Sequence, residues 1–133
     1  MRKLILLVIF TGMAFTSHSQ TADKYFNSGI AKINLKDYMG AIADFSKVIE
    51  IEPASAHAYY QRGCAKFKLE DYRGAIADYT KAIEIDSKEA TYYYVRGLAK
   101  IALEQKDSGC LDLSKAGELG YAKAYESIKK YCN

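Results

Sequence analysis

The side chains that could carry out covalent chemistry are few in this chain of 133 residues. A thiol nucleophile needs a histidine base beside it and usually a third group that orients the histidine. His57 precedes Cys64 by two helical turns, and no carboxylate stands at a matching position to orient it. We therefore expect His57 to be an exposed residue at a helix start and the protein not to be an enzyme.

Metal and cofactor sites are not indicated either. The three cysteines, Cys64, Cys110 and Cys132, are widely separated, and no short Cys/His spacing suits a zinc ion. A phosphate-binding loop needs a glycine-rich turn between a strand and a helix, and no segment has a convincing strand pattern. We expect the protein to hold no metal and no cofactor.

The segment 1–19 has the features of a secretory signal peptide. Arg2 and Lys3 form a positive start, an apolar run of twelve residues follows, and small residues two apart suit cleavage. The run is too short for a membrane-spanning helix, which needs about 20 residues, so we expect no stable membrane insertion. The mature chain is predicted to begin at about Gln20 in the periplasm or outside the cell, although an uncleaved anchor stays open.

The charge balance gives little support for binding to nucleic acid. The formal net charge is +3, but removal of the predicted signal peptide leaves 17 basic against 16 acidic residues. Basic and acidic residues also alternate along the chain and form no cluster. Since nucleic-acid binding depends on a basic patch, we expect no nucleic-acid partner.

An internal repeat of 34 residues organises the chain. Segment 22–55 is identical to 56–89 at 17 of 34 positions, and 56–89 is identical to 90–123 at 13 of 34. Self-similarity at such a period is the signature of stacked helical repeats. Nine positions are the same in all three copies: Ala22/Ala56/Ala90, Tyr25/Tyr59/Tyr93, Gly29/Gly63/Gly97, Ala31/Ala65/Ala99, Lys32/Lys66/Lys100, Leu35/Leu69/Leu103, Asp44/Asp78/Asp112, Lys47/Lys81/Lys115 and Glu50/Glu84/Glu118.

Each copy has the pattern of two helices joined by a tight turn. In the first copy, apolar residues recur every three or four positions over 22–35 and again from Tyr38 onward. Pro53 ends the second helix, because proline cannot continue a helix interior. We predict an all-α solenoid over 20–133, with repeats at 22–55, 56–89 and 90–120. The glycines shared by the three copies would let the paired helices approach closely.

The end of the chain is predicted to form a capping helix, 121–132, because a terminal repeat must cover its open apolar side. Five of its residues would face the third repeat: Tyr121, Ala124, Tyr125, Ile128 and Tyr131. Cys110 lies ten residues before the helix break at Gly120 and Cys132 twelve after it, so a helical hairpin brings them together. We predict that they form a disulfide in an oxidising compartment. The alternative is two buried thiols, and Cys64 stays unpaired.

Period, helix pairs and several key positions resemble the tetratricopeptide repeat. The matching residues are Tyr25, Gly29, Ala41, Phe45 and Pro53 in the first copy, Tyr59, Gly63, Ala75 and Tyr79 in the second, and Tyr93, Gly97 and Ala116 in the third. The family's leucine is replaced by Ser28, Arg62 and Arg96, and its tyrosine by Lys32, Lys66 and Lys100. The regular recurrence of these replacements indicates a subtype. The resemblance implies a protein-interaction module that binds a peptide or partner helix in a concave groove.

The spacing that recurs in the repeats also predicts ion pairs between neighbouring repeats. The second helix of one unit is expected to lie against the first helix of the next. This arrangement would bring Asp44 towards Arg62 and Asp78 towards Arg96.

The resemblance places the concave groove on the first helix of each unit. Its predicted lining is almost wholly apolar or aromatic: Phe26, Ile30, Ile33, Tyr60, Cys64, Phe67, Tyr94, Leu98 and Ile101. Relatives that grip the acidic C-termini of heat-shock chaperones use lysine, arginine and asparagine side chains where this chain has Phe26, Ile30, Gln61, Thr91 and Val95. We therefore expect an amphipathic helix or an apolar extended segment. Three alternatives stay open: the chain's own cap helix fills the groove, a second copy fills it because the protein self-associates as a structural subunit, or the protein is a thiol-dependent enzyme.

Overall fold

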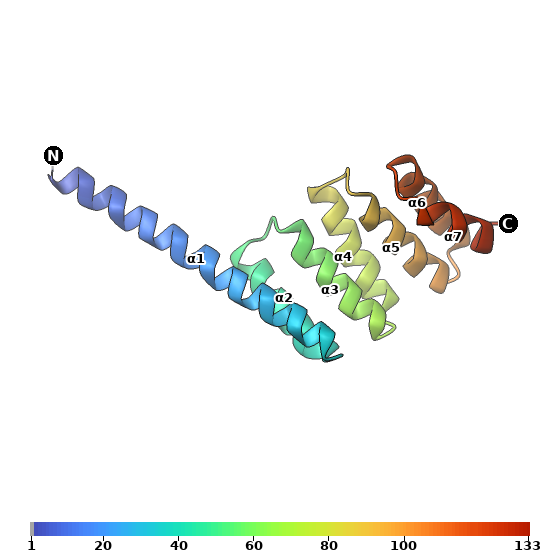
Figure 1. Cartoon of the computed structure of the whole chain (residues 1–133), viewed down its shortest axis with the longest axis horizontal. Coiled ribbons are helices and arrows are strands. Elements are labelled where there is room, and N and C mark those ends of the chain that lie inside the picture. The colour runs from blue at the N-terminus through green and yellow to red at the C-terminus, as the bar shows by residue number, and fades with distance from the viewer. Residues whose placement is uncertain (1) are drawn as a thin grey trace.

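The computed structural model describes the backbone of residues 2–133 and the side chains of residues 17–133. The described residues form seven α-helices and no strand (Figure 1). Their bounds are α1 Arg2–Asn34, α2 Tyr38–Ile51, α3 Ala56–Lys68, α4 Tyr72–Ile85, α5 Ala90–Ala102, α6 Lys106–Glu118 and α7 Lys123–Tyr131.

The helices stack as three antiparallel pairs, α1–α2, α3–α4 and α5–α6, with α7 against α6 at the C-terminal end (Figure 1). The predicted all-α solenoid is confirmed. The predicted capping helix, 121–132, corresponds to the shorter α7. The helix predicted over 22–35 is the end of α1, which also contains most of the predicted signal peptide; side chains 1–16 lie outside the described residues. Within the described part of the chain, no helix is both long and apolar enough to cross a membrane.

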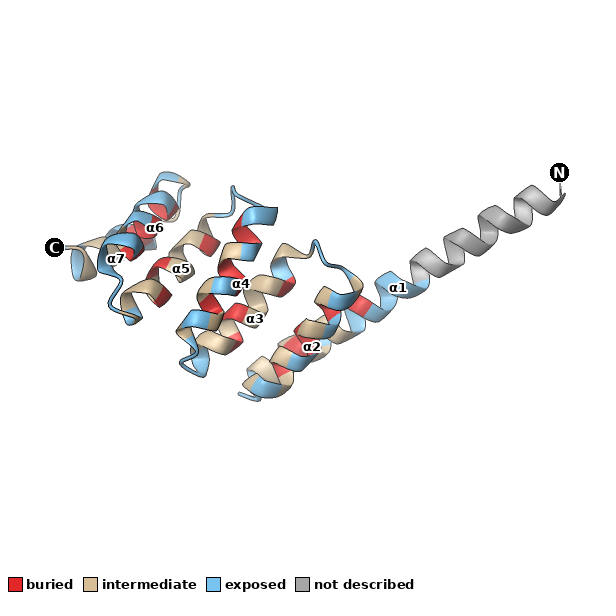
Figure 2. Ribbon diagram, turned by 180° about the vertical axis from the view of Figure 1, so that it is seen from behind, coloured by how far each residue is buried: buried red, intermediate tan, exposed pale blue. Residues whose placement is uncertain are grey.

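Small residues allow the two helices of each pair to pack closely. Buried residues occur on all seven helices (Figure 2). Gly63 in α3 faces the ring of Tyr79 in α4, and a Cβ atom at Gly63 would lie 2.7 Å from that ring. Gly97 in α5 meets Gly109 in α6 in the same way, with the Gly109 carbonyl oxygen 2.8 Å from an added Cβ. The shared glycines therefore have the packing role predicted for them.

The turns between paired helices combine two local signals. Asp71 caps the N-terminus of α4 by accepting a hydrogen bond from the Gly74 backbone amide, and Asp37 caps α2 in the same way. The residue before each cap is left-handed: φ is 61° at Lys36, 61° at Glu70 and 62° at Glu104. Helices often end with such a residue, but glycine normally occupies it because it has no Cβ atom.

This observation predicts a stabilising substitution. Glu70→Gly removes a left-handed strain of about 1–2 kcal/mol, and the flexibility of glycine in the unfolded chain offsets about 0.5–1 kcal/mol of the gain. We expect the free energy of unfolding to rise by about 0.5–1 kcal/mol in urea denaturation. Leu69→Gly is the control. Leu69 has a φ of −86°, so no left-handed strain is relieved there and glycine should lower the free energy of unfolding. A Glu70→Gly variant as unstable as Leu69→Gly would contradict the explanation.

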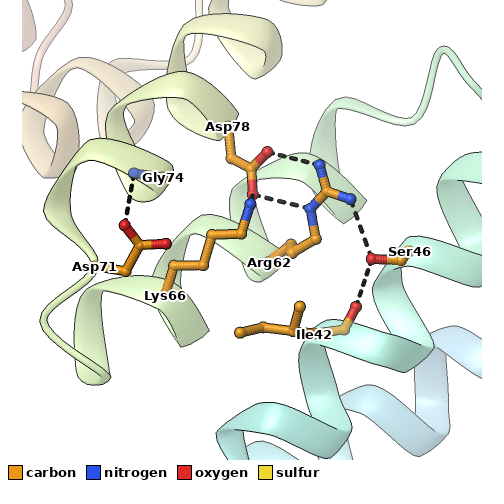
Figure 3. Close-up of polar contacts among 7 residues, drawn as sticks. All are labelled: Ile42, Ser46, Arg62, Lys66, Asp71, Gly74 and Asp78. Atoms are coloured by element: carbon orange, nitrogen blue, oxygen red, sulfur yellow. Dashed lines mark hydrogen bonds and ion pairs between the residues drawn. The ribbon is translucent and has the colours of Figure 1, made fainter.

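A buried charged network joins the helices of each pair (Figure 3). Asp78 in α4 is 4% exposed and accepts two hydrogen bonds from Arg62, at 2.9 Å from Nε and 2.8 Å from Nη2. Lys66 Nζ lies 2.9 Å from the same carboxylate. Arg96 and Lys100 surround Asp112 in the third repeat in the same arrangement. In the second and third copies, the arginine and the lysine that replace the expected leucine and tyrosine therefore both pair with the aspartate that all three copies share.

The predicted pairing of Asp44 with Arg62 and of Asp78 with Arg96 is wrong. Asp44 instead accepts a hydrogen bond from Ser28 Oγ at 2.6 Å and pairs with Lys32 at 2.9 Å. The antiparallel packing of a helix pair brings together residues that are 16 apart in sequence. Each aspartate therefore pairs within its own repeat and not with the arginine of the next repeat.

Neighbouring repeats are linked by the remaining nitrogen of each arginine. Arg62 Nη1 donates to Ser46 Oγ at 3.1 Å (Figure 3). Arg96 Nη1 donates to Thr80 Oγ1 at 3.2 Å. Each arginine thus uses its planar fork on its own aspartate and its third nitrogen on the preceding repeat. The link between units is a hydroxyl contact where the sequence suggested an ion pair.

Candidate functional site

The first helices form the inner side of the stack. α3 contacts both α1 and α5 directly, whereas the described second helices have no direct contacts of similar extent. We call the surface of α1, α3 and α5 the first-helix face. All nine predicted groove residues are half-buried: Phe26, Ile30, Ile33, Tyr60, Cys64, Phe67, Tyr94, Leu98 and Ile101.

An apolar pocket of about 170 Å³ lies between α3 and α5. Its walls are Cys64, Phe67, Lys68, Tyr79, Val95 and Leu98. Three of these, Cys64, Phe67 and Leu98, belong to the predicted groove. Lys68 supplies the one charged side chain of the lining. Tyr79 is not among the predicted groove residues, because its position in the repeat is typical of a core residue.

A second cavity of about 220 Å³, which we call the tyrosine pocket, lies at the N-terminal ends of the same two helices. It is lined by His57, Tyr60, Glu89, Thr91 and Tyr92. Glu89 caps α5: its Oε1 accepts hydrogen bonds from the Thr91 backbone amide at 3.3 Å and from Thr91 Oγ1 at 3.0 Å. Its Oε2 carries no hydrogen bond from the described residues. Tyr60 is the one residue of this lining that belongs to the predicted groove.

A row of aromatic rings crosses the first-helix face from α1 to α5. Phe26 stacks on His57 with ring centroids 5.4 Å apart, His57 lies 5.7 Å from Tyr60, and Tyr60 lies 5.2 Å from Tyr92. Contacts at these distances favour a fixed arrangement of the rings. His57 is exposed at a helix start, as predicted, but it is also part of this row.

The third repeat is partly covered by the cap. Tyr94 has its ring 4.7 Å from that of Tyr121, and its hydroxyl lies 3.2 Å from Ser127 Oγ in α7. Ile101 lies against α6, beside Gly109. Two of the nine predicted groove residues, Tyr94 and Ile101, therefore make contacts within the chain. The two pockets lie elsewhere on the first-helix face.

The geometry around Cys64 does not suit thiol catalysis. The described contacts of His57 are with Phe26, Tyr60 and Gln61, and none is with Cys64. Burial raises the pKa of the Cys64 thiol, although the Tyr79 hydroxyl 3.5 Å away partly opposes this effect. A buried thiol with a raised pKa is a weak nucleophile. No group of three or more His, Cys, Asp or Glu residues could hold a metal ion within the described residues.

The cap helix is held at both of its ends. Cys132, directly after α7, is joined to Cys110 of α6 as a disulfide, with Cα atoms 5.9 Å apart. Ala124, near the start of α7, is fully buried. Tyr125 is 57% exposed, so it covers the third repeat less than predicted, although its hydroxyl donates to the Gly117 carbonyl oxygen at 3.2 Å.

Comparisons with known proteins agree with this architecture. Family models described as tetratricopeptide repeat match residues 22–55 and 56–89. No curated protein sequence gives a significant match to the chain.

Similar solved structures come from several proteins. One is the second tetratricopeptide repeat domain of human RPAP3 in complex with the HSP70 peptide SGPTIEEVD; it is 23% identical, covers 87% of this chain and 98% of that chain, and has a TM-score of 0.83. The first such domain of Spaghetti (RPAP3), bound to the HSP90 peptide SRMEEVD, is 23% identical, with 86% and 92% coverage and a TM-score of 0.82. The TPR2B domain of yeast Sti1 in complex with pHsp70 is 26% identical, with 81% and 98% coverage and a TM-score of 0.71.

Proposed function

Because the chain belongs to the tetratricopeptide repeat family, we propose that it is a protein-interaction module that binds a peptide segment of a partner on its first-helix face. The observation that carries this proposal is the presence of two adjacent pockets between α3 and α5. Their lining side chains are held by packing and hydrogen bonds, so they are largely preformed, as ligand sites usually are. The peptides bound by the RPAP3 and Sti1 domains support the general mode of binding.

We propose a different ligand from the acidic chaperone peptides of those structures. Where lysine, arginine and asparagine side chains would grip an acidic C-terminus, this chain has Phe26, Ile30, Gln61, Thr91 and Val95. None of these five is charged. Without cations at these positions, a terminal carboxylate would lose water without gaining a partner, which is unfavourable.

The aromatic residues of the face provide a direct test. Truncating Tyr60 and Tyr94 together to alanine removes two half-buried rings, and we expect it to weaken peptide binding at least ten-fold. Peptides selected by the parent from a random library serve as probes, and fluorescence anisotropy gives the affinity. Circular dichroism is expected to show helical content close to that of the parent.

Tyr59→Ala with Tyr93→Ala is the matched control. These tyrosines are also half-buried on α3 and α5, but their rings lie beside Arg62 and Arg96, whereas Tyr60 lines the tyrosine pocket. The control variant should lose stability while it keeps its affinity. If the Tyr60/Tyr94 variant binds like the parent, the first-helix face is not the binding surface. A dimer in analytical ultracentrifugation that dissociates on these substitutions would favour self-association instead.

We also propose that the chain is exported and that the bond between Cys110 and Cys132 forms outside the cytoplasm. The features of segment 1–19 support export, and disulfides persist in oxidising compartments. Residues 17–21 are exposed and Ala22 is the first described residue that is buried, so cleavage near Gln20 would leave the repeat core complete. N-terminal sequencing of the protein from its own cells tests the proposal, and an intact Met1 would contradict it.

A further inference from the structure

The two pockets are arranged in line along the same pair of helices. Their linings are offset by about seven residues on α3, from His57 and Tyr60 to Cys64 and Phe67, and by a similar step on α5. Seven residues of an α-helix correspond to about 10 Å. A peptide in the polyproline II conformation has three residues per turn and advances about 3.1 Å per residue, so side chains three positions apart point to the same side and would reach the two pockets.

The apolar pocket fits one side chain of moderate size. A cavity of about 150 Å³ lined by apolar groups is large enough to bind benzene, and this pocket has about 170 Å³. Phe67, Val95 and Leu98 supply apolar walls on which a leucine, isoleucine, methionine or phenylalanine side chain can pack.

The tyrosine pocket has the opposite polarity. It presents the rings of Tyr60 and Tyr92 together with the Glu89 carboxylate, and no lysine or arginine lines it. A cation held over a tyrosine face is attracted by the ring, and a carboxylate adds a charge-assisted hydrogen bond.

The surroundings of this pocket are acidic. Burial, followed by the carboxylates of Glu89 and Asp86, raises the pKa of the Tyr92 hydroxyl. The N-terminus of α5 opposes these charges, but its dipole amounts to about half an elementary charge, less than one carboxylate. The local field therefore favours a positively charged group.

We propose that the ligand of the first-helix face is a peptide in the polyproline II conformation that carries a lysine or arginine and, three residues away, a leucine-sized apolar residue. The basic side chain occupies the tyrosine pocket and the apolar side chain occupies the apolar pocket. This inference rests on the function proposed above and adds the chemistry of the ligand. It leaves the direction of the peptide open, because the two pockets fix only the spacing.

Selection from a random octapeptide library displayed on phage, with the full chain as bait, tests the proposal. We expect enrichment of a basic and an apolar residue at positions i and i+3, in one order or the other. Enrichment of apolar residues without a basic one, or of acidic peptides, would overturn this inference while the proposed function stands. Failure to enrich any peptide would overturn both.

A charge variant then tests the tyrosine pocket directly. Glu89→Gln keeps an oxygen that can cap α5 but removes the charge, so the fold is preserved. We expect about ten-fold weaker binding of a selected arginine peptide and unchanged binding of the same peptide with glutamine at that position. Glu84→Gln, on the exposed side of α4, is the matched control and should leave both affinities unchanged. Equal affinity of Glu89→Gln and the parent for the arginine peptide would overturn the assignment.

The apolar pocket has its own variant. Val95→Phe places a larger ring at the pocket wall and should displace the apolar side chain of the ligand, which lowers the affinity at least ten-fold. Thermal unfolding checks that the variant is folded. A folded Val95→Phe variant that binds as tightly as the parent would show that the apolar pocket is not used.

Discussion

Replacing Asp78 with alanine is expected to destabilise the protein by about 3 kcal/mol, because it leaves the charges of Arg62 and Lys66 without their partner in a largely buried place. The side chains of Arg62 and Lys66 are 19% and 21% exposed, so water can relieve only part of the loss. Urea denaturation followed by far-ultraviolet circular dichroism measures the change. Removal of an exposed partner, as in Glu84→Ala, should cost about 0–1 kcal/mol at most.

A triple substitution separates the net contribution of the network to the free energy of unfolding from the cost of leaving its charges unpaired. Arg62→Leu, Lys66→Tyr and Asp78→Leu together replace all three charges with apolar side chains. Such replacements of buried ion networks are often neutral or stabilising, so we expect the triple variant to be far more stable than Asp78→Ala. If Asp78→Ala has the stability of the parent, the three charges are effectively solvated and the network does not hold the helix pair.

Loss of the disulfide is expected to have an effect of similar size. Cys110 and Cys132 are 22 residues apart, and closing such a loop stabilises a protein by about 3 kcal/mol in the chain-entropy model. α7 depends on this bond because a helix of nine residues is marginal by itself and its first turn has no side-chain cap. We expect the Cys110→Ser/Cys132→Ser variant to lose about this amount in urea denaturation.

Hydrogen exchange should localise the effect. In the double serine variant the amides of α7 are expected to lose protection, while those of α3 and α4 keep it at a reduced level. Cys64→Ser is the control, since Cys64 is a free thiol and its replacement leaves the disulfide in place. Unchanged protection of α7 without the disulfide would mean that packing alone holds the cap.

The repeat period made the helix pairs and their packing predictable from the sequence. Gly29, Gly63 and Gly97 recur every 34 residues, and at Gly63 the close approach of a Tyr79 ring explains why no side chain fits. The turns were also predictable, because the apolar pattern over 22–35 is interrupted before it resumes at Tyr38. The left-handed residues Lys36, Glu70 and Glu104 could not be predicted, since neither lysine nor glutamate indicates that conformation.

The partners of the charged residues were beyond the sequence. Periodicity shows that Asp44, Asp78 and Asp112 recur, but the choice between two neighbouring helices depends on the crossing geometry. The first repeat has Ser28 at the position where the later repeats have Arg62 and Arg96, and the structure explains this difference. In the later repeats the arginine at this position reaches back to Ser46 or Thr80, whereas no described repeat precedes the first one.

The residues that line the two pockets were predicted only in part, because repeat positions do not show how neighbouring helices meet. Repeat positions identify residues on the inner side of a helix, and Tyr60, Cys64, Phe67 and Leu98 do line the pockets. Glu89 precedes the helix, so its role in the tyrosine pocket follows only from the way in which α5 begins.

The most direct test of peptide binding on the first-helix face is a map of the contact in solution. Amide chemical shifts of the isotope-labelled protein are followed as a peptide selected by the parent is added. We predict the largest changes on α3 and α5 around Tyr60, Cys64, Val95 and Leu98, with small changes on α2, α4 and α6. Changes confined to the second helices, or spread evenly over the protein, would contradict the assignment of this face as the binding surface.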